Sequence, residues 1–130
     1  MIVTGAGSGI GQATALEAAR LGFGVVAAVR REAQVDGIEQ AARDADVKVT
    51  VEVLDVTDDD RAAEIIERHP PWGLVNAAGF LSPALLVDTP PSEARQHLDV
   101  MVLGPVRLAQ LALPSMRANG GGRIVNVSSI

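Results

Sequence analysis

The chain has 130 residues, which fits a single domain, because ordinary domains run to about 100–150 residues. Hydrophobic residues make up 48% of the sequence and charged residues 21%, a balance that supplies a core and excludes wholesale disorder. Eleven basic against sixteen acidic residues leave a net charge of −5, which argues against a nucleic-acid or anionic-membrane surface, and no apolar run is long enough to span a membrane.

Taken in chain order, apolar runs of strand length alternate with longer stretches of helical periodicity. This alternation is typical of βαβ units and predicts a Rossmann-like α/β fold, a doubly wound parallel sheet of about five strands with flanking helices, incomplete at the C-terminus. The expected strands span residues 2–4, 25–29, 47–53, 73–76 and 123–129. The expected helices span residues 10–21, 34–44, 57–68 and 92–116.

Local details refine these elements. The alternating segment 47–53 has a polar face, which predicts a strand near the edge of the sheet. Thr57, followed by three aspartates, is expected to cap the third helix. Residues 80–91 are interpreted as a loop with one helical turn. Gly104-Pro105 should kink the long helix, because proline removes a backbone hydrogen bond and clashes with the preceding turn.

The strongest local signal is the glycine-rich segment 4–11, Thr-Gly-Ala-Gly-Ser-Gly-Ile-Gly, between a strand and a helix. Backbone N–H groups and the positive end of the helix dipole meet there, which suits a pyrophosphate. The spacing fits neither G-x-G-x-x-G nor a P-loop, and Ser8 lacks the flanking glycines of a nucleophile elbow. A flexible surface turn is the alternative, but the strand–turn–helix context favours nucleotide binding.

The second signal lies at the end of the second strand, roughly twenty residues past the glycines. A site that prefers NAD usually places an acidic residue there, whereas this chain has Arg30 and Arg31. A guanidinium would attract a 2′-phosphate and leave an unphosphorylated ribose without its acceptor. A pair of solvated arginines is the alternative, and the sequence favours NADP (NADPH) over NAD.

Polar residues also follow the third, fourth and fifth strands, at 55–57, 76–79 and 126–129. The carboxyl ends of parallel strands share the edge at which such sheets bind ligands. Taken separately, each group is more typical of turn chemistry or strand-end capping. Together they predict one site.

With T-G-x-x-x-G-x-G, D-V-T, N-A-A-G and G-R-I-V-N-V-S-S in this order, the chain resembles the short-chain dehydrogenase/reductase family over nearly its whole length. The resemblance implies a single dinucleotide-binding Rossmann domain over residues 1–130. It also implies that Asp55 and Val56 contact the adenine ring, and that Ser129 is the catalytic serine. The cofactor-binding residues it implies are Thr4, Gly5, Gly7, Ser8, Gly9, Ile10, Gly11, Arg30, Asp55, Val56, Asn76, Ala77, Ala78 and Gly79.

The chain also departs from the family pattern. The family's proton donor is a tyrosine in a Y-x-x-x-K motif beyond the catalytic serine, but this chain has no tyrosine and its only lysine is Lys48. The family's active-site asparagine in the long helix falls on Met101. We therefore interpret the chain as the cofactor-binding front part of a reductase, truncated at both ends.

The leading hypothesis is an NADP-dependent oxidoreductase that acts on a small alcohol or carbonyl substrate. The alternative is a non-catalytic nucleotide-binding or regulatory protein with the same fold. A methyltransferase is disfavoured by Arg30, because its cofactor carries no 2′-phosphate. We expect no metal site, no nucleic-acid or membrane partner, a cytoplasmic location and a homo-oligomer.

Overall fold

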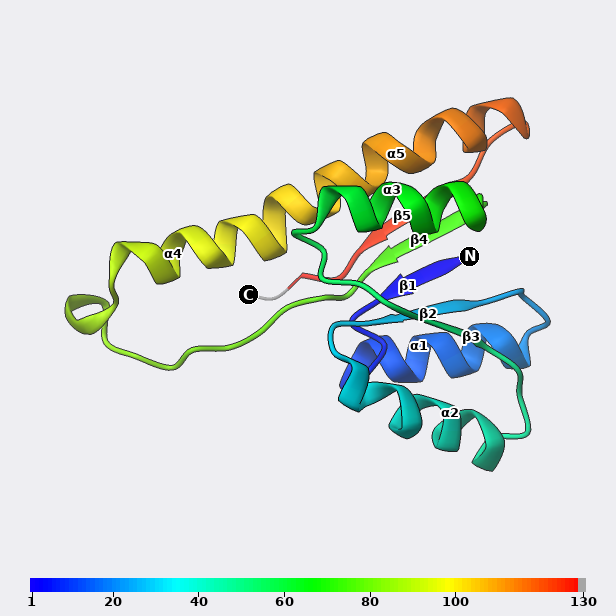
Figure 1. The fold of residues 1–130 in the computed structure, drawn as a ribbon, viewed down its shortest axis with the longest axis horizontal. Helices are drawn as coiled ribbons and strands as arrows, with labels where there is room; N and C mark the ends of the chain where they lie inside the picture. The colour runs from blue at the N-terminus through cyan, green and yellow to red at the C-terminus, as the bar shows by residue number, and fades with distance from the viewer. Residues whose placement is uncertain (129–130) are drawn as a thin grey trace.

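Five short apolar segments pair into one parallel sheet, as the sequence predicts (Figure 1). The computed structural model describes residues 1–128. The sheet has the order β3-β2-β1-β4-β5, and β1 lies at its centre with each of its three residues buried. The strands are β1 (Ile2–Thr4), β2 (Val26–Val29), β3 (Thr50–Val53), β4 (Gly73–Asn76) and β5 (Arg123–Asn126).

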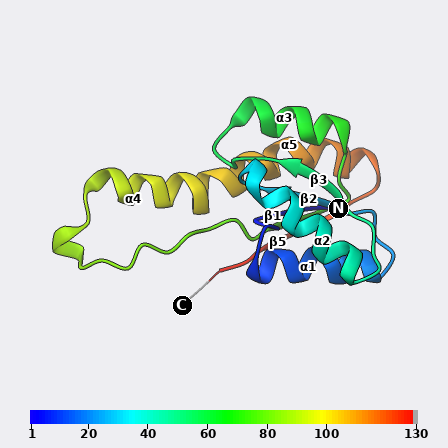
Figure 2. The ribbon, with the colours of Figure 1, turned by 60° about the horizontal axis from the view of Figure 1, so that its bottom comes forward.

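Helices cover both faces of the sheet, which explains why every residue of its inner strands is buried (Figures 1 and 2). On one face, Ala15, Ala18 and Ile38 of α1 and α2 pack against the sheet. On the other face, Ile65 and Leu108 of α3 and α5 complete a second core. The helices are α1 (Gly9–Arg20), α2 (Val35–Asp44), α3 (Asp59–Arg68), α4 (Pro91–Leu98) and α5 (Gly104–Ala118).

The connections place a switch point between β1 and β4. The chain moves outward from β1 to β2 and β3, then returns across the sheet to add β4 on the other side of β1. The segments that leave the carboxyl ends of β1 and β4 therefore turn towards opposite faces. Ligands of open parallel sheets bind at such a point.

Some boundaries differ from the sequence prediction. Thr57 does not cap α3; Asp58 does, because its carboxylate accepts the backbone N–H of Arg61 at 2.9 Å, while the Thr57 hydroxyl bonds Asp55. β3 begins at Thr50 rather than at residue 47, and β5 ends at Asn126. Alternation therefore located these strands but overestimated their length.

The long helix is interrupted before Gly104-Pro105, as expected, by the π-helical turn Asp99–Leu103. Such a turn accommodates a proline that has no N–H to donate. Gly104 allows α5 to approach the end of β3, since a Cβ there would lie 3.0 Å from Val56 Cγ2. α4 and the preceding loop, with one 3₁₀ turn (Leu86–Asp88), extend beyond the sheet (Figure 2). No helix within residues 1–128 combines the length and apolar character that crossing a bilayer requires.

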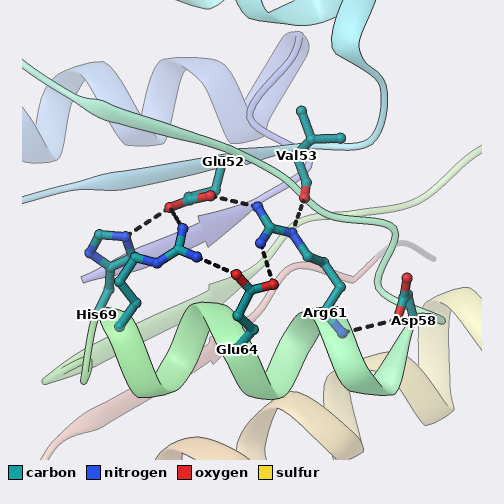
Figure 3. Close-up of polar contacts among 7 residues, drawn as sticks. Glu52, Val53, Asp58, Arg61, Glu64 and His69 are labelled. Atoms are coloured by element: carbon teal, nitrogen blue, oxygen red, sulfur yellow. Dashed lines mark hydrogen bonds and ion pairs between the residues drawn. The ribbon is translucent and has the colours of Figure 1, made fainter.

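An ion-pair network joins the edge strand β3 to α3 (Figure 3). Glu52 points towards α3 and accepts hydrogen bonds from Arg61 at 2.7 Å, Arg68 at 2.9 Å and His69 at 2.9 Å. Arg61 Nε also donates to the Val53 carbonyl at 3.1 Å, directly before the segment that enters the candidate site. On the polar face predicted for this edge strand, Glu52 is therefore covered by α3 side chains, whereas Thr50 is exposed.

Candidate functional site

A cleft of about 430 Å³ opens at the carboxyl ends of the strands, around the switch point. It has the size of ordinary small-molecule sites. The predicted residues that line it are Gly5, Gly7, Ser8, Ile10, Gly11, Arg30, Asp55, Val56, Ala77, Ala78 and Gly79. The glycine turn, Arg30, residues 55–56 and residues 77–79, which are far apart in the sequence, therefore line one cleft.

The glycine turn forms the floor of the cleft. It consists of glycines because neighbouring backbone atoms leave no room for a Cβ at two of its positions. Gly5 has φ +67°, and a Cβ there would lie 2.6 Å from the carbonyl oxygen of Ala77. A Cβ on Gly11 would lie 2.7 Å from the carbonyl carbon of Gly5. α1 begins directly after this turn, so its free N–H groups face the cleft. The cradle accepts a phosphate because no side chain holds the ligand away from the backbone.

Thr4 and Asn76 were predicted as cofactor ligands, but they lie beneath the cleft. The buried hydroxyl of Thr4 accepts the N–H groups of Ala77 and Ala78 at 3.1 and 3.2 Å. Asn76 is also buried, and its Nδ2 donates to Asn126 Oδ1 at 2.8 Å. Both residues connect the strands that hold the site, and neither lines it.

Arg30 and Asp55 meet at the side of the cleft that faces β2 and β3. Arg30 Nε donates to Asp55 Oδ2 at 3.3 Å, and the two side chains are 53% and 38% exposed. The other carboxylate oxygen of Asp55 accepts the backbone N–H and the hydroxyl of Thr57 at 3.0 and 2.7 Å. Partial burial opposes ionisation of Asp55, but the Thr57 hydrogen bonds and the charge of Arg30 outweigh it and lower its pKa. Asp55 is therefore a carboxylate that holds Arg30 at the rim.

Gly9, Met101 and Ser129 are three further positions that the sequence singles out, and none of them is among the described residues that line the cleft. Gly9 is in the turn with φ +56° but does not line the cleft. Met101, at the family's asparagine position, lies beside the site, because a Cβ on Gly79 would be 3.5 Å from its Cε. Ser129, the predicted catalytic serine, lies outside the described residues.

The cleft is also lined by residues outside the predicted cofactor-binding set: Arg31 and Val127, which lie within the segments that the sequence marks, and Gln34, Leu54, Phe80 and Val100. Leu54 precedes the D-V-T motif, Phe80 follows the N-A-A-G motif, and Val127 lies within G-R-I-V-N-V-S-S. Their positions next to or within these motifs could have predicted that they line the cleft. Gln34 and Val100 come from helical segments with no motif. Only the path of the chain brings them to the cleft.

The fold and the cleft together define a doubly wound α/β domain with a nucleotide site at its switch point. A glycine cradle suits a pyrophosphate, apolar walls from Leu54, Val56 and Val100 suit a flat ring, and Arg30 stands at the rim. The residues therefore fit a dinucleotide.

Comparison with known proteins identifies the family. The family model for short chain dehydrogenases matches residues 1–130, so the chain belongs to the short-chain dehydrogenase/reductase family of oxidoreductases. This confirms the resemblance drawn from the four ordered motifs.

Several relatives support the assignment. The 3-oxoacyl-(acyl-carrier-protein) reductase of Thermotoga maritima is 36% identical over 99% of this chain, which covers 54% of that enzyme. A short-chain dehydrogenase/reductase structure from Burkholderia xenovorans has a TM-score of 0.89 at 31% identity, with 98% of this chain and 52% of that one covered. An actinorhodin polyketide ketoreductase solved with NADPH has a TM-score of 0.89 at 27% identity, with the same coverage. The chain thus spans about half the length of the relatives it matches.

Proposed function

We propose that the chain binds NADPH and forms the cofactor-binding part of an oxidoreductase that acts on an alcohol or carbonyl group. The observation that carries this proposal is Arg30, which stands at the cleft rim where an NAD site usually has an acidic residue. Arg31 lines the same rim. The ketoreductase with NADPH supports the choice of cofactor by similarity.

The chain's own residues have separate tasks in this proposal. The glycine turn and the first turn of α1 hold the pyrophosphate, and Arg30 neutralises the 2′-phosphate. Asp55 orients Arg30 along the rim through the ion pair, in which Arg30 Nε lies 3.3 Å from Asp55 Oδ2. Bound NADPH would supply the hydride, and the protein would orient the nicotinamide and exclude water around it.

The proton that must accompany the hydride has no evident donor in this chain. The sequence contains no tyrosine, and exposed Lys48 precedes β3 at the opposite end of the sheet from the cleft. We propose that Ser129 polarises the substrate oxygen, as the family resemblance implies. A non-catalytic nucleotide-binding protein is the second candidate, and Met101 at the family's asparagine position is the observation that favours it.

Self-association is part of the same proposal. Val102, Leu103 and Val106 expose apolar side chains along the π-helical turn and α5, and Val125 is exposed on β5. Such surface is typical of protein–protein contacts. The cytoplasmic location stays a prediction from the sequence.

Calorimetric titration of the chain with NADPH and NADH tests cofactor binding. Tryptophan fluorescence is a poor probe, because Trp72 precedes β4 and stacks on Phe23 at the opposite end of the strand from the cleft. Arg30→Ala should weaken NADPH binding by about 1.5–3 kcal/mol and leave NADH nearly unchanged, because only NADPH has the phosphate that Arg30 would meet.

Arg43→Ala is the matched control, because Arg43 is exposed on α2 and pairs with Glu39 away from the cleft. It should change neither affinity. Equal losses for both cofactors in Arg30→Ala would assign Arg30 to the fold instead. No saturable NADPH binding by a chain shown to be folded by circular dichroism would contradict the proposed function.

A further inference from the structure

Gln34 occupies a place in the cleft that no motif marks. It ends the 3₁₀ turn Glu32–Gln34 that follows β2, and its side chain is half-buried. The 3₁₀ turn brings it between Gly7 of the glycine turn and Arg31 of the rim. Gln34 therefore contacts both the glycine turn and Arg31 at the rim.

Two hydrogen bonds with Arg31 hold Gln34, one through its backbone and one that fixes the orientation of its side-chain amide. The Gln34 backbone N–H donates to the Arg31 carbonyl at 2.9 Å, and the Arg31 N–H donates to Gln34 Oε1 at 3.1 Å. An amide NH₂ group cannot accept a hydrogen bond, so Oε1 must be the atom that faces Arg31. Nε2 is consequently turned towards Gly7, where an added Cβ would lie 2.8 Å from Gln34 Cδ.

The Gln34 Nε2 group carries two N–H donors into the cleft beside Gly7. Within residues 1–128 it donates no hydrogen bond, and it lies on the side of the glycine turn nearest the two arginines. The free N–H groups at the start of α1, which suit a pyrophosphate, lie further along the turn, where Ile10 and Gly11 line the cleft. Arg30 uses its Nε for Asp55 and keeps its Nη groups for a phosphate at the rim, and Gln34 Nε2 adds a neutral donor to the same cleft.

We propose that Gln34 is a specificity-determining residue whose Nε2 donates a hydrogen bond to the 2′-phosphate of NADPH. This inference rests on the proposed function. The amide is held in place by its contacts with Arg31, so binding costs little additional side-chain entropy. A neutral donor also contributes without adding a third positive charge to a rim that already holds two arginines.

The test compares NADPH and NADH affinities of the chain by calorimetry in two variants. Gln34→Met removes the donor with little change in length, and it should weaken NADPH about tenfold while NADH changes less than about twofold. Gln34→Glu retains an acceptor for the Arg31 N–H but replaces the donor with a charge. It should leave the turn intact and weaken NADPH more than Gln34→Met does.

Gln40→Met is the matched control, because Gln40 is exposed on α2 and bonds Asp44 outside the cleft. A role restricted to capping the turn would make Gln34→Met affect both cofactors alike and would leave Gln34→Glu close to the unsubstituted chain. Either result would overturn the proposal.

A second readout follows the Gln34 side-chain amide directly by ¹H–¹⁵N spectroscopy. Adenosine 2′,5′-bisphosphate should shift its resonances strongly, whereas 5′-ADP should not. Equal shifts with both compounds would assign Gln34 to the pyrophosphate and contradict the inference. NADPH binding that is unchanged in Gln34→Met would refute the Gln34 role alone, while absence of NADPH binding by the unsubstituted chain would refute the proposed function with it.

Discussion

At the scale of single residues, the glycine turn shows that one residue type serves different ends. Gly9 has φ +56°, and nothing lies within 4 Å of a Cβ added there, so its left-handed backbone conformation rather than crowding favours glycine. Gly11 has a helical backbone, and clearance requires glycine instead, because a Cβ would meet the backbone of Gly5 and lie 3.0 Å from the Thr4 carbonyl oxygen. Backbone atoms cannot rotate aside as a flexible side chain would.

Gly11→Ala should therefore lower the free energy of unfolding by about 1–3 kcal/mol, the usual cost of overpacking, despite the better helix propensity of alanine. Urea unfolding followed by circular dichroism measures this change. Gly37→Ala in α2 is the control, since nothing lies within 4 Å of a Cβ there. It should stabilise the chain by about 0.5–1 kcal/mol. An unchanged midpoint for Gly11→Ala would show that the turn can relax.

At the scale of elements, β3 is the strand at one edge of the sheet, and Glu52 is its buried charge, with a side chain 10% exposed. An inward-pointing charge on an edge strand disfavours pairing with another chain. Arg61 and Arg68 neutralise it and also pair with Glu64 (Figure 3). Because ionised Glu52 can only accept hydrogen bonds, His69 Nε2 is the donor in their contact.

Burial raises the pKa of Glu52, but the hydrogen bonds from His69 and Arg68 and the charges of both arginines outweigh burial, so the pKa is lowered. A folded-state pKa below the unfolded one stabilises the protein above the unfolded pKa, near 4.3 for glutamate. This contribution is lost as the pH falls through the lower, folded pKa. The network should therefore weaken in acid.

Glu52→Gln should lower the free energy of unfolding at pH 7 by about 1–3 kcal/mol, because two guanidinium groups lose their charged partner. Urea unfolding across a pH series should show the difference from the unsubstituted chain shrinking in acid, where protonated Glu52 resembles glutamine. Glu67→Gln, at an exposed position on α3, should have no measurable effect. If the difference in unfolding free energy between Glu52→Gln and the unsubstituted chain persisted at low pH, the charge of Glu52 would not be the source of its stabilising contribution.

At the scale of the whole molecule, the sheet is unequally covered. β1 is buried, whereas all four residues of β5 are exposed, and among residues 1–128 no strand pairs with its outer edge. The cleft lies at the carboxyl ends of the strands around β1, and the segments after β2, β3 and β4 supply most of its walls. The cofactor site is thus supported by both cores, while the β5 side is open to association with another chain.

The 130-residue chain should bind NADPH without reducing carbonyl compounds. A positioned general acid typically contributes about 10²–10⁴ in rate, and the serine hydroxyl is a poor acid near neutral pH. NADPH oxidation over a panel of aldehydes and ketones measures turnover, with an active full-length family member as the positive control. Turnover comparable with that control would require a proton donor that the sequence does not reveal.

Local patterns determined the element types, the parallel sheet and the family. Strand alternation and helical periodicity depend on neighbouring residues, and the four motifs are ordered along the chain. The tertiary structure alone placed Thr4 beneath the cleft, transferred the α3 cap to Asp58, and surrounded Glu52 with cations. It also brought Gln34 to Gly7 and Arg30 to Asp55. The Arg30–Asp55 and Gly7–Gln34 contacts join residues 25 and 27 positions apart, and their distances depend on how each loop leaves its strand, which no local periodicity encodes.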